Sequence, residues 1–384
     1  MPFTFLVAWL AGMLPLALLG AAAYLVWAWY VGEVVETVWL IVGIVLLLWS
    51  VFGRSLVLLT RRGGTEEPRS ERGGRGQRVA GPGGADLHVE EHGPEVGAPT
   101  LLMTHGWVLD ATAWYYEKKH LADRFRLVLW DLPGLGLSTQ PKDGRYSLEG
   151  MAHDLRAVFD ATAGGRRVVL VGHSIGGMTI LTFCRLFPEL LGREIAGIVL
   201  VNTTYTMPLN TIIAGGLLRA LRWSVLVPLL YLTTALWPLV WPINRKSYLD
   251  GSAHKATSWA TLSGQETRGQ LDFAARFTAK QHPGVLAKGI LAMLRWDETA
   301  TLPTILVPTL IITSDRDKLT LPRASEEMAR LIPRAELLMV EPAGHLGFLE
   351  RSVEYDEAIA GFAARCLARA TPAAERLRGA DGTL

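Results

Sequence analysis

This chain has few cysteines and a small net charge, and its amino-terminal stretch, residues 3–31, has no charged side chain. The 384 residues include only two cysteines, Cys184 and Cys366, so neither a disulfide framework nor a cysteine zinc site is possible. We interpret them as buried free thiols, which suit a reducing compartment. The formal net charge of +2 is too small to favour a nucleic-acid partner. No internal repeat is visible, and the histidines lack the spacing of metal ligands.

The uncharged stretch predicts a membrane segment. Residues 3–31 exceed the roughly 20 apolar residues that a spanning helix needs. A second apolar run over 37–52 follows a short acidic connection, and it extends further if Arg54 snorkels. We therefore expect transmembrane helices over about 3–31 and 36–56. A cleaved signal peptide is the alternative, but the amino end has no Lys or Arg and the apolar run continues past the alanines at 21–23.

Arginines crowd the region after the second run, whereas the connection between the two runs is acidic. The positive-inside rule then places both termini and the rest of the chain on the cytoplasmic side of the cell membrane. Residues 61–84 are rich in Gly, Arg, Glu and Pro and predict a flexible linker. The arginines concerned are Arg54, Arg61, Arg62, Arg69, Arg72, Arg75 and Arg78.

From residue 85 the pattern changes to short apolar runs separated by helix-like stretches. This alternation predicts an α/β domain with a mostly parallel sheet covered by helices, over 85–372, followed by a tail over 373–384. In such sheets the chemistry gathers at the carboxyl ends of the strands. The predicted strands are 100–103, 126–130, 168–171, 195–201, 309–312 and 336–340, and the predicted helices include 148–163 and 324–331.

The most informative of these strand ends is Gly172-His173-Ser174-Ile175-Gly176. Four apolar, strand-like residues precede it and a helix-like stretch follows. This is the context in which G-x-S-x-G forms a nucleophile elbow, with the serine hydroxyl lifted to the sheet edge. Gly172 and Gly176 supply room, because a Cβ at either position would crowd the turn.

Other strand ends supply the remaining parts of a serine hydrolase. Asp315 and Asp317 follow one strand, His345 follows the last, and His105-Gly106-Trp107 follows the first. Serine, acid and histidine occur in the chain order of the α/β-hydrolases. With the turn over 131–138, these motifs resemble the α/β-hydrolase fold superfamily over about 84–369. The membrane segments are also similar in architecture to membrane-bound monoacylglycerol lipases and related esterases.

Acyl-transfer chemistry assigns the roles. Ser174 is the nucleophile, His345 its general base, and an aspartate orients the imidazole. Asp315 competes with Asp317 for the last role, and the resemblance favours Asp317. The backbone N–H groups of Trp107 and Ile175 would hold the oxyanion. No metal or organic cofactor is needed. Framework or turn roles are expected for His105, His173, Asp131 and Ser138, and ordinary polar roles for His88, His92, His120, His153, His254 and His282.

The stretch from about 203 to 300 leaves the sheet pattern and predicts an inserted helical cap. Its first part, over 225–242, is unusually apolar. One interpretation buries these residues against the core, and another dips them into the bilayer as a lid. A third crossing helix fits poorly, because Pro228, Pro238 and Pro242 interrupt the run and Arg219 and Arg222 precede it.

The resulting hypothesis is a membrane-anchored serine hydrolase that cleaves a hydrophobic carboxylic ester, with an acylglycerol-like lipid as the leading substrate. A serine at position 174 argues against epoxide hydrolases and haloalkane dehalogenases, which attack with an aspartate. A carbon–carbon hydrolase or a cofactor-free perhydrolase would use the same three side chains. A non-catalytic scaffold is disfavoured because all three are present.

Overall fold

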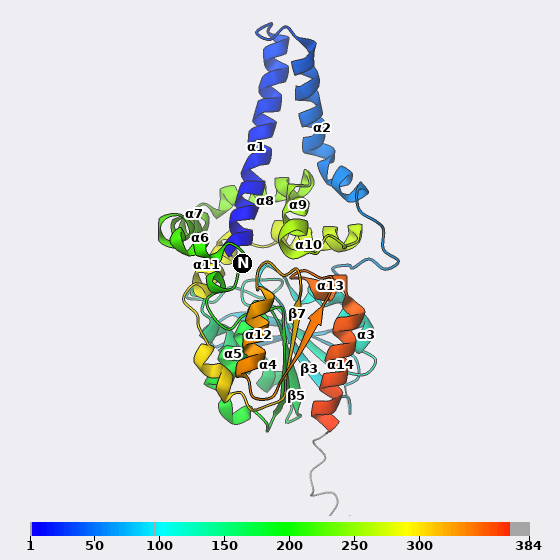
Figure 1. The fold of residues 1–384 in the computed structure, drawn as a ribbon, viewed down its shortest axis with the longest axis vertical. Helices are drawn as coiled ribbons and strands as arrows, with labels where there is room; N and C mark the ends of the chain where they lie inside the picture. The colour runs from blue at the N-terminus through cyan, green and yellow to red at the C-terminus, as the bar shows by residue number, and fades with distance from the viewer. Residues whose placement is uncertain (1, 96, 369–384) are drawn as a thin grey trace, which may run out of the picture.

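A computed structural model describes residues 2–95 and 97–368 and arranges them in three tiers (Figure 1). A sheet covered by helices forms one end, a group of short helices called here the cap lies across it, and a helical hairpin rises from the cap. The cap is the insertion between β6 and β7. The predicted tail over 373–384 lies outside the described residues.

The hairpin consists of α1 (Pro2–Tyr30) and α2 (Thr37–Leu59), which matches both predicted apolar runs. A Cβ added at Gly43 of α2 would lie 2.9 Å from Val26, so the two helices pack closely there. By length and composition α2 could cross a bilayer, while the apolar part of α1 found over Pro15–Tyr30 is shorter. Most large apolar side chains on α2 are exposed, including Ile41, Val45, Val51 and Phe52.

Eight strands form a single sheet in the order β1-β2-β4-β3-β5-β6-β7-β8. β3 to β8 run parallel, and β1 and β2 are antiparallel to their neighbours. All six predicted strands are present. The strands are β1 (Arg75–Ala80), β2 (Asp86–His92), β3 (Thr100–Thr104), β4 (Arg126–Trp130), β5 (Val168–His173), β6 (Ile195–Val201), β7 (Thr309–Ser314) and β8 (Ala335–Val340).

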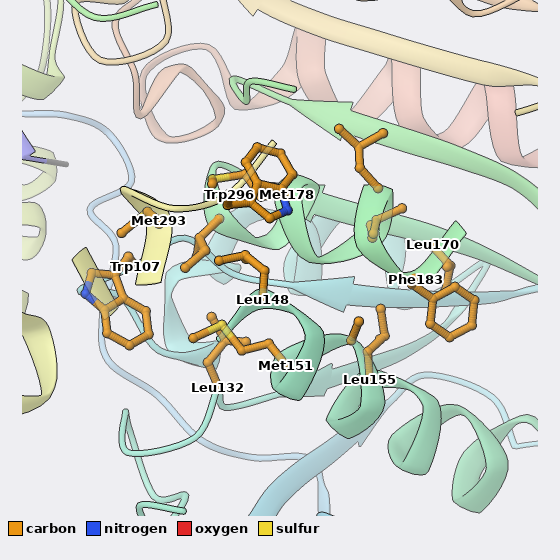
Figure 2. Packing of buried hydrophobic residues seen from close by; sticks show 14 of the residues in the cluster. Trp107, Leu132, Leu148, Met151, Leu155, Leu170, Met178, Phe183, Met293 and Trp296 are labelled. Carbon is orange, nitrogen blue, oxygen red and sulfur yellow. The ribbon is translucent and has the colours of Figure 1, made fainter. Parts of the chain in front are cut away.

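Helices cover both faces of this sheet, as the alternation of elements predicted. Successive strand residues alternate between the two cores: Leu102 and Leu170 pack with α4 and α5, whereas Leu101 and Val169 pack with α3 and α14. Figure 2 shows the first of these cores. The covering helices are α3 (Tyr115–Leu121), α4 (Leu148–Ala163), α5 (Ile175–Leu186), α12 (Pro322–Leu331), α13 (Gly347–Glu350) and α14 (Ser352–Ala368).

The prediction of a flexible linker over 61–84 is wrong, because part of it is β1 and the rest packs on the sheet and cap. Arg72 donates to Glu90 on β2 at 2.6 Å and to Asp131 at 2.9 Å. Burial alone would raise the pKa of Glu90, but its hydrogen bonds from His92, His88 and Arg72 lower that pKa to about 2. The polar composition therefore reflects an edge strand and buried ion pairs.

The cap begins at the end of β6 and contains six α-helices among its described residues. α7 and α8 meet at Leu236 with a bend of 99°, so the apolar run does not form one straight crossing helix. Leu226 and Leu230 are buried against the core, whereas Trp223 is 65% and Leu239 63% exposed, so burial accounts for only part of this run. The helices are α6 (Gly215–Ala220), α7 (Val227–Ala235), α8 (Trp237–Leu249), α9 (Ser252–Thr261), α10 (Arg268–Lys280) and α11 (Pro283–Met293).

The lower part of the hairpin packs directly on the cap. A Cβ added at Gly53 of α2 would lie 2.2 Å from the carbonyl oxygen of Asp250, so the two backbones almost touch. The next residue, Arg54, donates to both carboxylate oxygens of Asp272 on α10, each at 2.9 Å. Tyr248 and His254 also contact Asp272 at 2.9 Å. Arg54 thus forms a bidentate ion pair with the cap, whereas the sequence analysis considered that its side chain snorkels.

This close approach predicts that Gly53→Val loosens the hairpin from the cap. The added side chain cannot fit beside Asp250, and overpacking of this kind typically costs about 1–3 kcal/mol. We expect the melting temperature of the detergent-solubilised protein to fall by several degrees. Gly20→Val is the matched control, because an added Cβ there meets nothing within 4 Å. Equal melting temperatures for the two variants would contradict the packing.

Candidate active site

The turn between β5 and α5 has the geometry of a strained elbow. Ser174 adopts φ 53° and ψ −118°, a backbone conformation that is rare outside glycine. A Cβ at Gly172 would lie 2.5 Å from the backbone of Gly176, and one at Gly176 would lie 2.2 Å from the carbonyl oxygen of Thr104. The two glycines therefore provide the room that the sequence predicted.

Ser174, His345 and Asp317 come together at the carboxyl edge of the sheet from three separate loops. Ser174 Oγ lies 3.0 Å from His345 Nε2, and His345 Nδ1 lies 2.8 Å from Asp317 Oδ2. All three residues are buried. Because Asp317 can only accept, His345 donates through Nδ1, and Nε2 is left to accept from the serine hydroxyl. This is the tautomer that a general base requires.

The structure distinguishes the two candidate aspartates. Asp315 does not contact His345, because one of its carboxylate oxygens accepts the backbone N–H of Ala343 at 2.9 Å and the other lies 3.5 Å from Arg316. Asp317 accepts the backbone N–H groups of Leu319 and Thr320 at 2.8 and 2.9 Å. Asp315 therefore braces the loop that precedes His345, while Asp317 contacts the imidazole itself.

Further side chains hold Asp317 in place, and sequence reasoning missed them. Asn202 Nδ2 donates to Asp317 Oδ2 at 3.0 Å and to Ser314 Oγ at 2.9 Å, and the Tyr355 hydroxyl donates to Asn202 Oδ1 at 2.8 Å. Thr320 Oγ1 donates to Asp317 at 2.7 Å. Burial favours the neutral acid, but the charge of His345 and these hydrogen bonds outweigh it and lower the pKa of Asp317.

The predicted oxyanion residues flank the serine. Ile175 is the first residue of α5, so its N–H has no intrahelical partner. The N–H of Trp107 has no acceptor among the described residues. A Cβ at Gly106 would lie 2.5 Å from His173 Nδ1, which shows that the loop after β3 packs against the elbow. The Ile175 N–H therefore follows Ser174 directly, and the Trp107 N–H lies on a loop that packs against the elbow.

The Trp107 side chain connects this loop to the cap. Its Nε1 donates to the carbonyl oxygen of Leu286 on α11 at 3.1 Å. A Cβ added at Gly289 would lie 2.0 Å from the Trp107 indole, so α11 packs face-on against the ring. Trp107 belongs to the same apolar core as Met178 and Met293 (Figure 2). No sequence signal pointed to Gly289.

The neighbouring histidines have framework contacts. His105 Nδ1 donates to the carbonyl oxygen of Gly106 at 2.8 Å, and its Nε2 accepts the N–H of Leu132 at 3.0 Å. His173 Nε2 donates to the carbonyl oxygen of His345 at 3.0 Å. Burial lowers the pKa of both imidazoles, so both are neutral. Their contacts fit the framework roles expected of them.

Asp131 and Ser138 stabilise their turn as predicted. Asp131 accepts the N–H groups of Ala111 and Leu137 at 2.7 and 2.8 Å, and Ser138 Oγ donates to the Asp131 carbonyl oxygen at 2.6 Å. Several remaining histidines bind carboxylates, including His120 to Asp356 at 2.7 Å. Across residues 2–95 and 97–368 no group of three or more potential ligands is arranged to hold a metal ion.

Known proteins are similar to this chain in sequence and in fold. A family model described as the alpha/beta hydrolase fold matches residues 99–352. The chain belongs to this family. A protein of Stutzerimonas stutzeri assigned as a carbamate hydrolase is 27% identical over 272 residues, covering 71% of this chain and 94% of that protein. A pimeloyl-[acyl-carrier protein] methyl ester esterase of Nitrosomonas europaea is 27% identical over 267 residues, with 69% and 94% covered.

Solved structures agree on the fold. A thermophilic esterase from Thermogutta terrifontis superposes with a TM-score of 0.60 at 24% identity, covering 76% of this chain and 99% of its own. The family match over 99–352 includes strands β3 to β8 and the cap. Esterases and other hydrolases are thus among the proteins to which this chain is similar.

Proposed function

We propose that this chain is a membrane-anchored serine hydrolase that cleaves hydrophobic carboxylic esters through an acyl-enzyme. The observation that carries the proposal is the hydrogen-bonded chain from Ser174 Oγ through His345 to Asp317, at 3.0 and 2.8 Å. Family membership and the esterase relatives support ester chemistry.

In the proposed mechanism Ser174 Oγ attacks the ester carbonyl carbon while His345 Nε2 removes the hydroxyl proton. The carbonyl oxygen becomes an oxyanion, held by the N–H groups of Trp107 and Ile175. When the tetrahedral intermediate collapses, His345 returns the proton to the departing alcohol, leaving an acyl group on Ser174. A water molecule, deprotonated by the same imidazole, then attacks the acyl-enzyme and releases the carboxylic acid. Asp317 remains anionic throughout and stabilises the imidazolium.

The proposed membrane placement rests on the hairpin and on the cap. The hairpin loop carries Glu33 and Glu36, whereas arginines cluster at the other end of α2, which favours a cytoplasmic hydrolase domain. The outer face of the cap exposes large apolar side chains close to the base of the hairpin. Exposed apolar patches of this kind mark interaction surfaces, and the adjoining hairpin makes the bilayer the natural partner. The exposed apolar side chains of the cap include Leu217, Trp223, Tyr231, Leu232, Leu239 and Trp241.

This arrangement supports a lipid-like substrate. Trp107 and Ile175 share an apolar core with residues of the cap helices, including Leu226, Leu230 and Ile290, so the surroundings of Ser174 favour an acyl chain. An ester dissolved in the bilayer would meet the exposed face of the cap before reaching Ser174. An acylglycerol-like ester is therefore the proposed substrate.

A chain-length series tests this substrate class. We expect kcat/KM for p-nitrophenyl esters to rise at least about tenfold from acetate to decanoate, because each buried methylene contributes about 0.8 kcal/mol. Addition of phospholipid vesicles should raise the rate for the long esters further. A carbamate belongs in the same panel, because one relative is assigned as a carbamate hydrolase.

The double variant Trp223→Ser/Leu239→Ser separates membrane contact from chemistry. It should lose the vesicle stimulation and keep the rate on soluble p-nitrophenyl butyrate. A wild-type preference for acetate, with no gain from vesicles, would reject the lipid substrate. Covalent labelling of Ser174 by a fluorophosphonate, without hydrolysis of any ester in the panel, would instead favour the carbon–carbon hydrolase or perhydrolase alternatives.

A further inference from the structure

The junction between hairpin and cap contains an apolar cavity outside the candidate active site. It has a volume of about 270 Å³ and lies between Leu18 on α1, Leu46 and Trp49 on α2, and Lys246 and Lys255 on the cap. Its walls combine membrane-facing apolar side chains with two ammonium groups. An aqueous metabolite would gain little from such walls, whereas an acyl chain would be buried by them.

A second hollow, of about 350 Å³, adjoins the first. Its lining includes the basic side chains of Arg61, Lys255 and Lys318, beside apolar ones that include Trp259 and Leu262. Lys255 lines both hollows, which shows that the apolar cavity opens beside the basic one. Together they form a two-part site, apolar on the hairpin side and cationic on the side of the sheet.

Two of the cations at this site lack a carboxylate partner among the described residues. Lys246 pairs with Asp250 at 2.9 Å, and Arg61 with Glu266 at 3.3 Å. Lys255 and Lys318 form no such pair within 2–95 and 97–368. Each lies near a tryptophan ring, Lys255 at 5.8 Å from Trp49 and Lys318 at 4.7 Å from Trp259, and Lys318 Nζ also donates to the Trp259 carbonyl oxygen at 2.6 Å. The site therefore carries an unneutralised charge of two.

Lysine beside tryptophan is typical of the headgroup level of a membrane. The antiparallel hairpin places the apolar cavity nearer its base than its loop, where α2 meets the cap. If the hairpin spans the bilayer, the cavity lies in the cytoplasmic leaflet and the basic hollow at its surface. This is the level at which anionic phospholipids concentrate.

We propose that the hairpin–cap junction binds one anionic glycerophospholipid as a structural ligand. An acyl chain would occupy the cavity between Leu18, Leu46 and Trp49, and the phosphate would lie between Lys255 and Lys318. The lipid would fix the orientation of the cap against the membrane and is not hydrolysed there. The inference rests on the proposed membrane placement of the hairpin and not on the ester chemistry at Ser174.

Native mass spectrometry of the full-length protein in detergent tests the site with two probes, phosphatidylglycerol and phosphatidylcholine. We expect one phosphatidylglycerol to be retained at least about tenfold more tightly, because each lysine near an anionic headgroup contributes about fivefold. Lys255→Gln/Lys318→Gln should remove this preference. Arg245→Gln/Arg295→Gln is the matched control, since it removes two exposed cap-region charges that line neither hollow.

The apolar part has its own pair of variants. Leu18→Trp should fill the cavity and weaken binding of both lipids, whereas Leu16→Trp, also on α1 and equally exposed, should not. Equal retention of the two lipids by the wild type, or an undiminished preference in Lys255→Gln/Lys318→Gln, would overturn the proposal. Displacement of the lipid by millimolar glycerol phosphate would also overturn it, because it would identify a site for free phosphate esters.

Fluorophosphonate labelling of Ser174 in the same samples keeps the two proposals separate. A wild-type protein that is labelled at Ser174 but shows no preference for phosphatidylglycerol would reject the lipid site alone. Intact lipid binding without labelling would reject the ester chemistry alone. A melting temperature within about 2 °C of wild type qualifies a variant for comparison.

Discussion

Replacing Ser174 by alanine should lower kcat/KM for p-nitrophenyl butyrate by at least about 10⁴-fold. The Ser174 hydroxyl is the group that contacts the proposed general base, His345 Nε2, and loss of a triad nucleophile in other serine hydrolases costs up to about 10⁶-fold in rate. Covalent labelling by a fluorophosphonate should disappear at the same time. The fold should survive, because the change removes one oxygen and leaves the elbow glycines in place.

Ser224→Ala is the matched control, since Ser224 is an exposed serine of the cap and is not among the side chains that contact His345. That variant should keep wild-type labelling and activity. Labelling that persists in Ser174→Ala would disprove the assignment of the nucleophile. Activity that persists without labelling would mean that hydrolysis takes place elsewhere in the molecule.

The second large effect should come from Asp317→Asn, with kcat reduced about 10³–10⁴-fold and KM little changed. An amide cannot stabilise the imidazolium, and it can turn an N–H donor toward His345 Nδ1, which favours the wrong tautomer. The amide also brings a second N–H donor beside Asn202 Nδ2, which donates to Asp317 at 3.0 Å. Both effects act on the chemical step, so the substrate should still bind.

Asp315→Asn provides the comparison from the same loop. Its amide oxygen can still accept the N–H of Ala343, so activity should stay within about threefold of wild type. Stopped-flow measurement of acylation for both variants separates the chemical step from binding. Equal losses in the two variants would contradict the assignment of Asp317, and a larger loss in Asp315→Asn would reverse it.

The central sheet was predictable because its strands are buried on both faces. Such strands become continuous apolar runs, and those ending at Trp130 and Val201 were found at their predicted positions. β1 and β2 gave no such signal. They lie at one end of the sheet, and their polar residues have partners elsewhere in the chain, as Glu91 on β2 has in Arg126 at 3.0 Å. Composition alone made this region resemble a solvated linker.

The candidate active site likewise has residues that the sequence identified and residues that only the structure identified. Ser174 was identified from the glycine pattern that a strand-to-helix turn demands, and His345 from its place after the last strand. Asp317 needed the tertiary structure, since Asp315 has the same chemistry only two residues away. Asn202 and Tyr355 were missed because nothing local marks them: their contact joins residues separated by 153 positions, and only packing creates it.

The sequence by itself determined the apolar helices of the hairpin, the alternation that builds the sheet and the elbow at Ser174. These features depend on local hydropathy and on backbone conformation, which neighbouring residues control. Only the tertiary structure decided which aspartate contacts His345, that Arg54 pairs with Asp272 across 218 positions, and that hairpin and cap enclose a common cavity. These features depend on distances between remote segments, which are established only when the chain folds.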